Sequence, residues 1–220
     1  KFLAHFETKK CNVLYVDEEN GLITIPNRIH MLKIGHDLMV EKFDNMFAMI
    51  DQGVMLDKDS DVEFGKLSGL DVIKKAIKEY SVKLIIIDSM VRCLDGEENN
   101  SRDVRKVFEN LKPIISDKND VSIVILHHTV KGSGQSITRL RGSGDFAAFA
   151  DVVLMFEGSN GLVKVNVAKN RHVDIQLLPR FSFRVNNVND GVRLDFVDRP
   201  KTPTKKELCM DDIVKWFTEN

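Results

Sequence analysis

The 220-residue sequence lacks several features that would assign it to a class at once. It has no run of 18 or more apolar residues, which excludes a membrane-spanning helix. Its net charge is only -1, so it has no global attraction to nucleic acid or to an anionic membrane, and a DNA contact would need a local basic patch. Internal repeats and low-complexity tracts are absent as well. The remaining composition, 43% hydrophobic and 30% charged, is that of an ordinary globular protein.

Cysteine is also scarce. Cys11, Cys93 and Cys209 are odd in number and far apart, and no two of them have the spacing of a metal-ligand pair. We therefore expect reduced thiols and a cytoplasmic location. The chain opens on Lys1 rather than methionine, so the lack of a signal peptide says little, and we expect further sequence before Lys1.

Buried strands alternate with helices over the first 156 residues. The stretch V-K-L-I-I-I-D-S-M at 82–90 holds four consecutive apolar residues, which is typical of a strand covered on both faces in a parallel sheet. We expect strands over 12–17, 45–50, 82–90, 121–126 and 151–156, and helices over 24–37, 70–80, 101–115 and 146–150. Pro26 suits the first turn of its helix, and Ser101 suits a helix N-cap. This order predicts an α/β fold with a mainly parallel, twisted sheet and helices on both faces.

The pattern changes towards the C-terminus. Residues 162–168 and 191–196 alternate between apolar and polar, and Asn160-Gly161 is a hairpin signal. We expect antiparallel strands added at the C-terminal edge of the sheet. We expect residues 199–206 to form a basic, proline-containing linker and residues 206–219 to form a helix with an apolar face. The predicted division is a core over 1–198 and a linker with a further helix over 199–220.

Polar residues end three of the predicted strands. They are Asp17, Glu18 and Glu19 after the first strand, Asp88 after the third, and His127 and His128 after the fourth. In a parallel sheet these tips meet at one edge, where open α/β sheets bind ligands. Carboxylates and a polar sensor there suit a nucleotide with Mg²⁺.

Simpler interpretations of these tips stay open. Asp88 would serve as a turn cap, and Glu18 and Glu19 as acids at a helix N-terminus. His127 and His128 alternate across a strand end, so only one faces the site easily. No third ligand with zinc-like spacing accompanies them.

Five motifs in order resemble the RecA-like ATPases, and most closely the branch of plasmid-type hexameric replicative helicases. They are V-L-Y-V-D-E-E-N, L-I-I-I-D-S-M, I-L-H-H-T-V-K-G, R-G-S-G-D-F-A-A-F-A-D-V-V-L and A-K-N-R, within roughly residues 1–185. The resemblance implies a RecA-like fold, ATP and Mg²⁺ as cofactors, single-stranded DNA as partner and a ring, hexameric in that branch.

The same resemblance assigns site residues. Glu19, or else Glu18, corresponds to the catalytic glutamate, and Asp88 to the metal-associated Walker B aspartate with Asp17 beside it. His127 or His128 corresponds to the sensor. Arg171 corresponds to an arginine finger that reaches a neighbouring subunit's nucleotide, with Lys169 as its partner.

One departure from the family is large, because the sequence contains no G-x-x-x-x-G-K-[ST] phosphate-binding loop. Gly132–Ser136 lacks the lysine and follows the wrong strand. In the family this loop precedes the position of Lys1, so we expect the loop and its strand in the sequence before Lys1. A protein that truly lacks the loop would lose the cradle and lysine that hold the phosphates.

A glycine-rich stretch, 131–145, is the predicted DNA contact. It carries three basic residues, Lys131, Arg139 and Arg141, and no acid before Asp145. A solvated loop without a ligand is the alternative. The tail from Lys206 resembles the first helix of a winged-helix module, which often follows the ATPase core in this branch.

The sequence therefore favours an ATP-dependent, helicase-like motor on single-stranded DNA in replication. A recombinase-like or regulatory DNA-binding ATPase that does not unwind is the first alternative. A nucleotide-free interaction module that keeps only the fold is the second.

Overall fold

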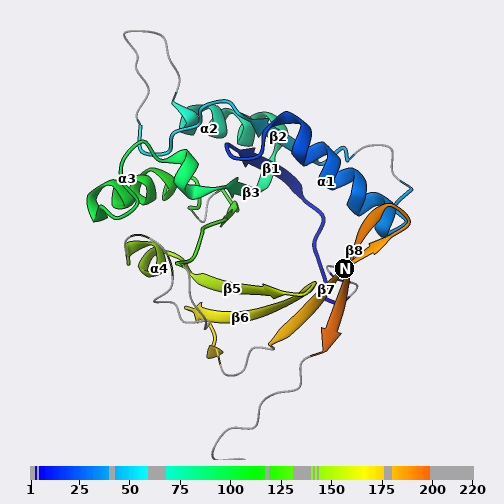
Figure 1. Ribbon diagram of the computed structural model, residues 1–220. Helices are drawn as coiled ribbons and strands as arrows, with labels where there is room; N and C mark the ends of the chain where they lie inside the picture. The colour runs from blue at the N-terminus through cyan, green and yellow to red at the C-terminus, as the bar shows by residue number, and fades with distance from the viewer. Residues whose placement is uncertain are drawn as a thin grey trace, which may run out of the picture.

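Two four-stranded sheets make up the protein in the computed structural model (Figure 1), which describes residues 3, 5–39, 43–58, 68–116, 119–130, 140, 142, 144–175 and 180–198. Strands β1 to β4 form a parallel sheet and strands β5 to β8 an antiparallel one. In chain order the elements are β1 (Asn12–Asp17), α1 (Gly21–Gly35), β2 (Met46–Ile50), α2 (Gly69–Tyr80), β3 (Val82–Asp88), η1 (Met90–Cys93), α3 (Ser101–Leu111), β4 (Ser122–Ile125), α4 (Asp145–Phe149), β5 (Val152–Ser159), β6 (Leu162–Asn170), β7 (Phe181–Val188) and β8 (Gly191–Asp198).

The parallel sheet has the strand order β2-β1-β3-β4, so β1 and β3 lie at its centre. Each strand is joined to the next in sequence by a helix or a segment containing one, which confirms the predicted α/β class. Across the sheet, the connection from β1 to β2 runs in one direction, and the connections from β2 to β3 and from β3 to β4 run in the opposite direction. Because parallel crossovers are right-handed, α1 lies on the opposite side from α2 and α3.

The main hydrophobic core lies between the parallel sheet and helices α2 and α3. Alternate residues of the two central strands point into it, among them Leu14, Val16, Ile85 and Ile87, each at most 1% exposed. The helices contribute apolar faces at the spacing of a 3.6-residue period, namely Leu70, Ile73 and Ala76 of α2 and Val104, Val107, Phe108 and Leu111 of α3. This core holds the strand ends in register at the site.

Strand β4 is less covered than its sequence predicts. The apolar run 121–126 suggests burial on both faces, but Val124 is 45% and Leu126 42% exposed. The strand is an edge strand that pairs only with β3, and α3 covers the side that carries Ile123 and Ile125. An apolar run alone does not show whether both faces of the strand are covered by other elements.

The antiparallel strands form their own sheet, in the order β5-β6-β7-β8, rather than an extension of the parallel one. Strand β5 was expected as a third buried strand of the parallel sheet, and that expectation is wrong. It pairs antiparallel with β6, and Val153 and Met155 are buried while Leu154 and Phe156 are exposed. Strand β7 was not predicted, because its second half is polar, with Asn186 and Asn187.

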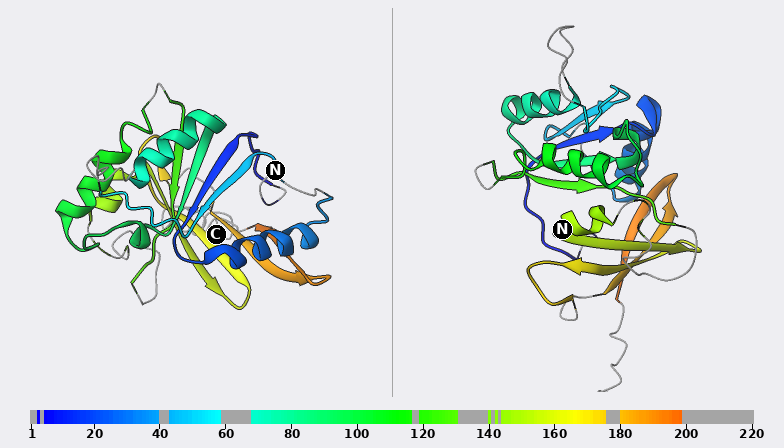
Figure 2. Two further views of the ribbon diagram at one scale, coloured as in Figure 1. Left: turned by 90° about the horizontal axis from the view of Figure 1, so that it is seen from above. Right: turned by 90° about the vertical axis from the view of Figure 1, so that its left-hand side faces the viewer.

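Helix α1 and the N-terminal segment connect the two sheets. His36, just after α1, accepts a hydrogen bond from the backbone N–H of Leu194 in β8 through Nε2, at 3.0 Å. A Cβ on Gly35 would overlap the backbone carbonyl of Val192, so only glycine allows this close approach. The ring of His5 stacks on Phe196 with centroids 3.9 Å apart. Figure 2 shows the antiparallel sheet beneath the parallel one, with α1 along its side.

Two helix starts differ slightly from prediction. Helix α1 begins at Gly21, so Pro26 lies in its second turn and not its first; the carbonyl that loses a partner belongs to Leu22, which is exposed to water. Helix α3 is capped by Asn100, whose Oδ1 accepts from the Arg102 N–H at 3.0 Å, and Ser101 is its first helical residue.

No helix in the described part of the chain is long and apolar enough to cross a membrane. The predicted helix over 206–219 and the linker before it lie outside the described residues.

Candidate functional site

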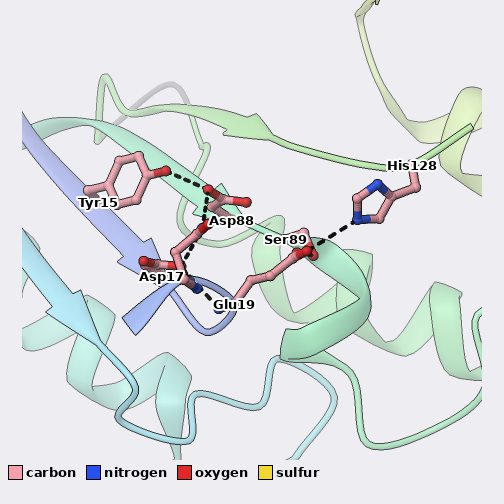
Figure 3. A network of polar contacts seen from close by, with 7 residues as sticks. Tyr15, Asp17, Glu19, Asp88, Ser89 and His128 are labelled. Carbon is pink, nitrogen blue, oxygen red and sulfur yellow. Dashed lines mark hydrogen bonds and ion pairs between the residues drawn. The ribbon is translucent and has the colours of Figure 1, made fainter. Parts of the chain in front are cut away.

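The carboxyl ends of β1 and β3 lie side by side and bring the predicted carboxylates together. Asp17 and Asp88 are register partners in the parallel pairing of these strands. The turn after β1 carries Glu18 and Glu19, and the chain after β4 carries the two histidines. Figure 3 shows Glu19 between Asp88 and His128, with Ser89 beside it. The structure therefore gathers side chains from three strand ends at one edge of the sheet.

Asp88 is held from one side only. Its Oδ2 accepts a hydrogen bond from the Tyr15 hydroxyl at 2.6 Å (Figure 3). It accepts another from the Asn20 amide at 3.1 Å. Its Oδ1 has no hydrogen bond to any described residue, and the residue is 9% exposed. The peptide bond to Ser89 is cis. One carboxylate oxygen is thus fixed and the other is left for a ligand.

Asp17 organises the turn after β1. It is fully buried, and its Oδ1 accepts from the backbone N–H groups of Glu19 and Asn20 and from the Asn20 amide, at 2.9 to 3.1 Å. Its Oδ2 is buried without a hydrogen-bond partner among the described residues. Aspartate in this position shapes a turn through its backbone contacts. The geometry thus gives Asp17 a structural task beside its predicted place in the cofactor site.

Glu18 binds the backbone loop that follows β2. Its carboxylate accepts hydrogen bonds from the N–H groups of Gln52, Gly53 and Val54 at 3.0 to 3.2 Å. Three backbone donors on one carboxylate are a strong, charge-assisted arrangement. Of the two adjacent glutamates, this one joins the ends of β1 and β2.

Glu19 faces the interior of the site. Its Oε2 accepts a hydrogen bond from the Ser89 hydroxyl at 2.5 Å, and its Oε1 lies 3.6 Å from Nε2 of His128 (Figure 3). The side chain is 31% exposed, so solvent reaches it. A solvent-accessible carboxylate held at two points is suited to orient a water and accept its proton.

The two histidines take different positions, as their alternation predicts. His128 approaches Glu19, whereas the ring of His127 packs against Phe146 of α4 with centroids 4.4 Å apart. His128 is therefore the histidine that reaches the carboxylates.

Lys169 and Arg171 lie at the end of β6 and bind α4, not the carboxylate cluster. Lys169 Nζ donates to the carbonyl oxygens of Ala147, Ala148 and Ala150 at 2.7 to 3.1 Å. Arg171 pairs with Asp151 at 3.0 Å and donates to the Ala148 carbonyl at 2.6 Å. Burial and the neighbouring guanidinium lower the pKa of Lys169. Both cations meet the carbonyl end of a helix, where positive charge is favoured.

The predicted DNA-contacting residues Lys131, Arg139 and Arg141 lie outside the described residues. The chain on either side is placed: Thr129 and Leu140 form an antiparallel bridge. Thr129 and Leu140, the described residues that flank the stretch, therefore lie next to each other close to the histidines.

Three site residues were not singled out from the sequence. Tyr15 reads as an ordinary apolar-facing strand residue, Asn20 as a turn residue, and Ser89 as the residue after a strand. Each donates a hydrogen bond to a carboxylate of the cluster. Because side chains alternate along a strand, Tyr15 and Asp17 lie on the same face of the sheet. Pairing of the first and third predicted strands would then have brought Tyr15 near Asp88.

The carboxylates of this cluster fit a Mg²⁺ ion that is shared with a nucleotide rather than one held by protein ligands alone. No group of three or more His, Cys, Asp or Glu side chains in the described ranges forms a cage for a metal. Mg²⁺ in nucleotide sites is usually bound through one or two carboxylates, with water and phosphate as the other ligands. Asp88 Oδ1, which accepts no hydrogen bond from the described chain, meets that requirement.

Comparison with known protein families shows where the chain belongs. A family model described as an AAA domain matches residues 1–134, which is more than half of the chain and includes β1 to β4 with Asp17, Glu18, Glu19 and Asp88. No curated protein matches the sequence.

Proposed function

This chain belongs to the AAA domain family, whose members are nucleotide-dependent ATPases of the AAA or RecA type, and we propose that it is the ATPase core of a motor acting on single-stranded DNA in replication. In this proposal the motor works as a ring of identical subunits. The observation that carries it is the position of Glu19, next to Asp88 and within reach of His128 at one sheet edge.

The proposed roles follow from the contacts. Glu19 orients a water molecule for attack on the terminal phosphorus of ATP and takes the proton that the water loses. Asp88 would hold Mg²⁺ through Oδ1, directly or through a water, and the ion would supply positive charge beside the phosphates. His128 senses the terminal phosphate and passes its state to the chain beyond Thr129.

Glu19→Gln in the full gene product tests the catalytic assignment. Glutamine keeps the size and the hydrogen bond from Ser89 but cannot accept a proton. We expect ATP to bind within about threefold of wild type while turnover falls by about 10² to 10⁴, the usual contribution of a general base. The measurements are nucleotide affinity by equilibrium dialysis and steady-state phosphate release.

Glu18→Gln is the matched control, because it makes the same change one residue away. Turnover per folded molecule should survive in this variant, since Glu18 binds the backbone of residues 52–54. Wild-type turnover in Glu19→Gln together with loss in Glu18→Gln would reverse the two assignments. Absence of Mg-dependent ATP binding in the wild-type full gene product would point to an interaction module.

A strand-displacement assay tests the motor part. We expect the full gene product to hydrolyse ATP faster with single-stranded DNA and to separate a forked duplex. Hydrolysis without displacement would instead favour a recombinase-like or regulatory ATPase. Thr129, which follows His128 directly and bridges to Leu140, is the described residue closest to the predicted DNA contact, and this supports the proposal that the contact responds to the nucleotide.

A further inference from the structure

Tyr15 approaches the carboxylate of Asp88 from the neighbouring strand. In the register of β1 and β3, Tyr15 is opposite Ile86 and Asp17 is opposite Asp88, so Tyr15 and Asp88 are diagonal neighbours. Diagonal pairs on a sheet are within reach of long aromatic side chains. The hydroxyl spans this distance and donates to Oδ2 at 2.6 Å.

The same oxygen receives a second donor. The Asn20 amide lies 3.1 Å from Asp88 Oδ2 and also contacts Asp17 Oδ1, at 3.1 Å. The outer torsion of an aspartate is broad, so an unsupported carboxylate turns freely. With two donors on Oδ2, the carboxylate plane of Asp88 is fixed and Oδ1 points away from both.

The Tyr15 hydroxyl acts only as a donor here. Burial raises its pKa well above the ordinary value for tyrosine, and the hydrogen bond and the charge of Asp88 raise it further. The hydroxyl therefore serves as a hydrogen-bond donor to Asp88 Oδ2, as the 2.6 Å contact shows.

We propose that Tyr15 is a positioning residue for the cation of the nucleotide complex: its hydroxyl holds Asp88 Oδ2 so that Oδ1 is presented to Mg²⁺. The inference rests on the proposed function, in which Asp88 is the metal-side carboxylate. Tyr15 makes no contact with the ion itself. Outer-shell partners of this kind typically change metal affinity by about 10- to 100-fold when they are removed.

Tyr15→Phe in the full gene product tests the proposal, because it removes the hydroxyl and keeps the ring. The probe is Mn²⁺ with a non-hydrolysable ATP analogue, and free Mn²⁺ is measured by electron paramagnetic resonance. We expect Mn²⁺ affinity to fall by about tenfold. Affinity for the analogue in EDTA should stay at its wild-type value, which a merely structural role of the hydroxyl would not allow.

Tyr80→Phe is the matched control. Tyr80 is the other tyrosine of the chain, and it stacks on Phe47 at the end of α2. Its loss of a hydroxyl should leave Mn²⁺ binding unchanged. Asn20→Ala removes the second donor from Oδ2 and should weaken Mn²⁺ binding in the same direction, which keeps the test open if Tyr15→Phe fails to fold.

The outcomes distinguish failure of the positioning role of Tyr15 from failure of the proposed function. Wild-type Mn²⁺ affinity in Tyr15→Phe, or equal losses in Tyr15→Phe and Tyr80→Phe, overturns the positioning role. Lack of any Mn²⁺-dependent analogue binding in the wild-type protein overturns the proposed function itself.

Discussion

The adjacent residues Glu18 and Glu19 have very different surroundings. Glu18 is bound by three backbone N–H groups of the 52–54 loop, whereas Glu19 is held by a serine hydroxyl and a histidine and remains accessible to solvent. The alternation of side chains along an extended turn produces this division. One carboxylate therefore supports the fold, and the other is the one to which the proposed function assigns the catalytic role.

Glu18→Gln should lower stability more than it lowers activity. The amide oxygen of glutamine is a weaker acceptor than a carboxylate for three N–H donors, so we expect a loss of about 1–3 kcal/mol in the free energy of unfolding. Urea denaturation measures it, with Glu19→Gln as the comparison. A smaller loss in Glu18→Gln than in Glu19→Gln would contradict the assignment of Glu18 to the loop.

Cys93 gives a pH-dependent prediction. Burial raises the pKa of its thiol to about 12, and the nearby carboxylates of Glu18, Asp88 and Asp17 act in the same direction. The thiolate is the reactive form, so the buried side chain should resist alkylation from pH 7 to 10, while Cys11, which is partly exposed, reacts. Mass spectrometry after iodoacetamide treatment of a Cys209→Ser variant follows both thiols. Rapid labelling of Cys93 in the folded protein at pH 8 would be inconsistent with this burial.

Helices and strands with a regular spacing of apolar residues were predictable from the sequence. The strands with which they pair were not. The spacing of apolar residues identified α2 and α3, and the runs around Val16 and Ile87 identified the central strands. Strand β5 was expected in the wrong sheet, because an apolar run predicts a buried strand but does not show which strand it pairs with. The carboxylates were predicted from strand ends, but their donors Tyr15 and Ser89 depend on register between strands far apart in sequence.

Gly35→Ala tests the junction between α1 and β8. Alanine normally stabilises a helix by about 1 kcal/mol over glycine, yet here its Cβ would overlap the backbone carbonyl of Val192. We expect a net destabilisation of about 1–3 kcal/mol, as for overpacked sites. Differential denaturation in urea is the measurement.

Gly158→Ala is the control for that variant. Its nearest neighbour would be a side-chain methyl of Val163 at 3.9 Å, an ordinary contact in strand β5. The stability of this variant should be unchanged or slightly higher. Equal losses in both variants would mean that the close approach of α1 and β8 does not limit stability.

At the scale of the whole molecule, Arg171 and Lys169 are bound within their own subunit at α4. A role for Arg171 in a neighbouring site requires that it leave Asp151 and the Ala148 carbonyl. The proposed ring therefore has a specific consequence for mixtures of variants.

Mixing Glu19→Gln with Arg171→Ala subunits should restore activity that neither variant has alone. In an equal mixture, roughly a quarter of head-to-tail interfaces combine an intact Glu19 with an intact Arg171. Phosphate release across a titration of the two variants measures it. Activity that never exceeds the sum of the separate variants would show that Arg171 does not act across subunits.

Helix α1 sets the spacing between the nucleotide-side turn and the second sheet. Its first residue follows the turn that carries Glu19 and Asn20, and its last, Gly35, is pinned against β8. Each residue of an α-helix turns the chain by about 100° and advances it by about 1.5 Å. Insertion of a single residue would therefore rotate one anchor out of phase with the other, so the fifteen-residue length of α1 is a fixed dimension of the protein and not a freely variable connection.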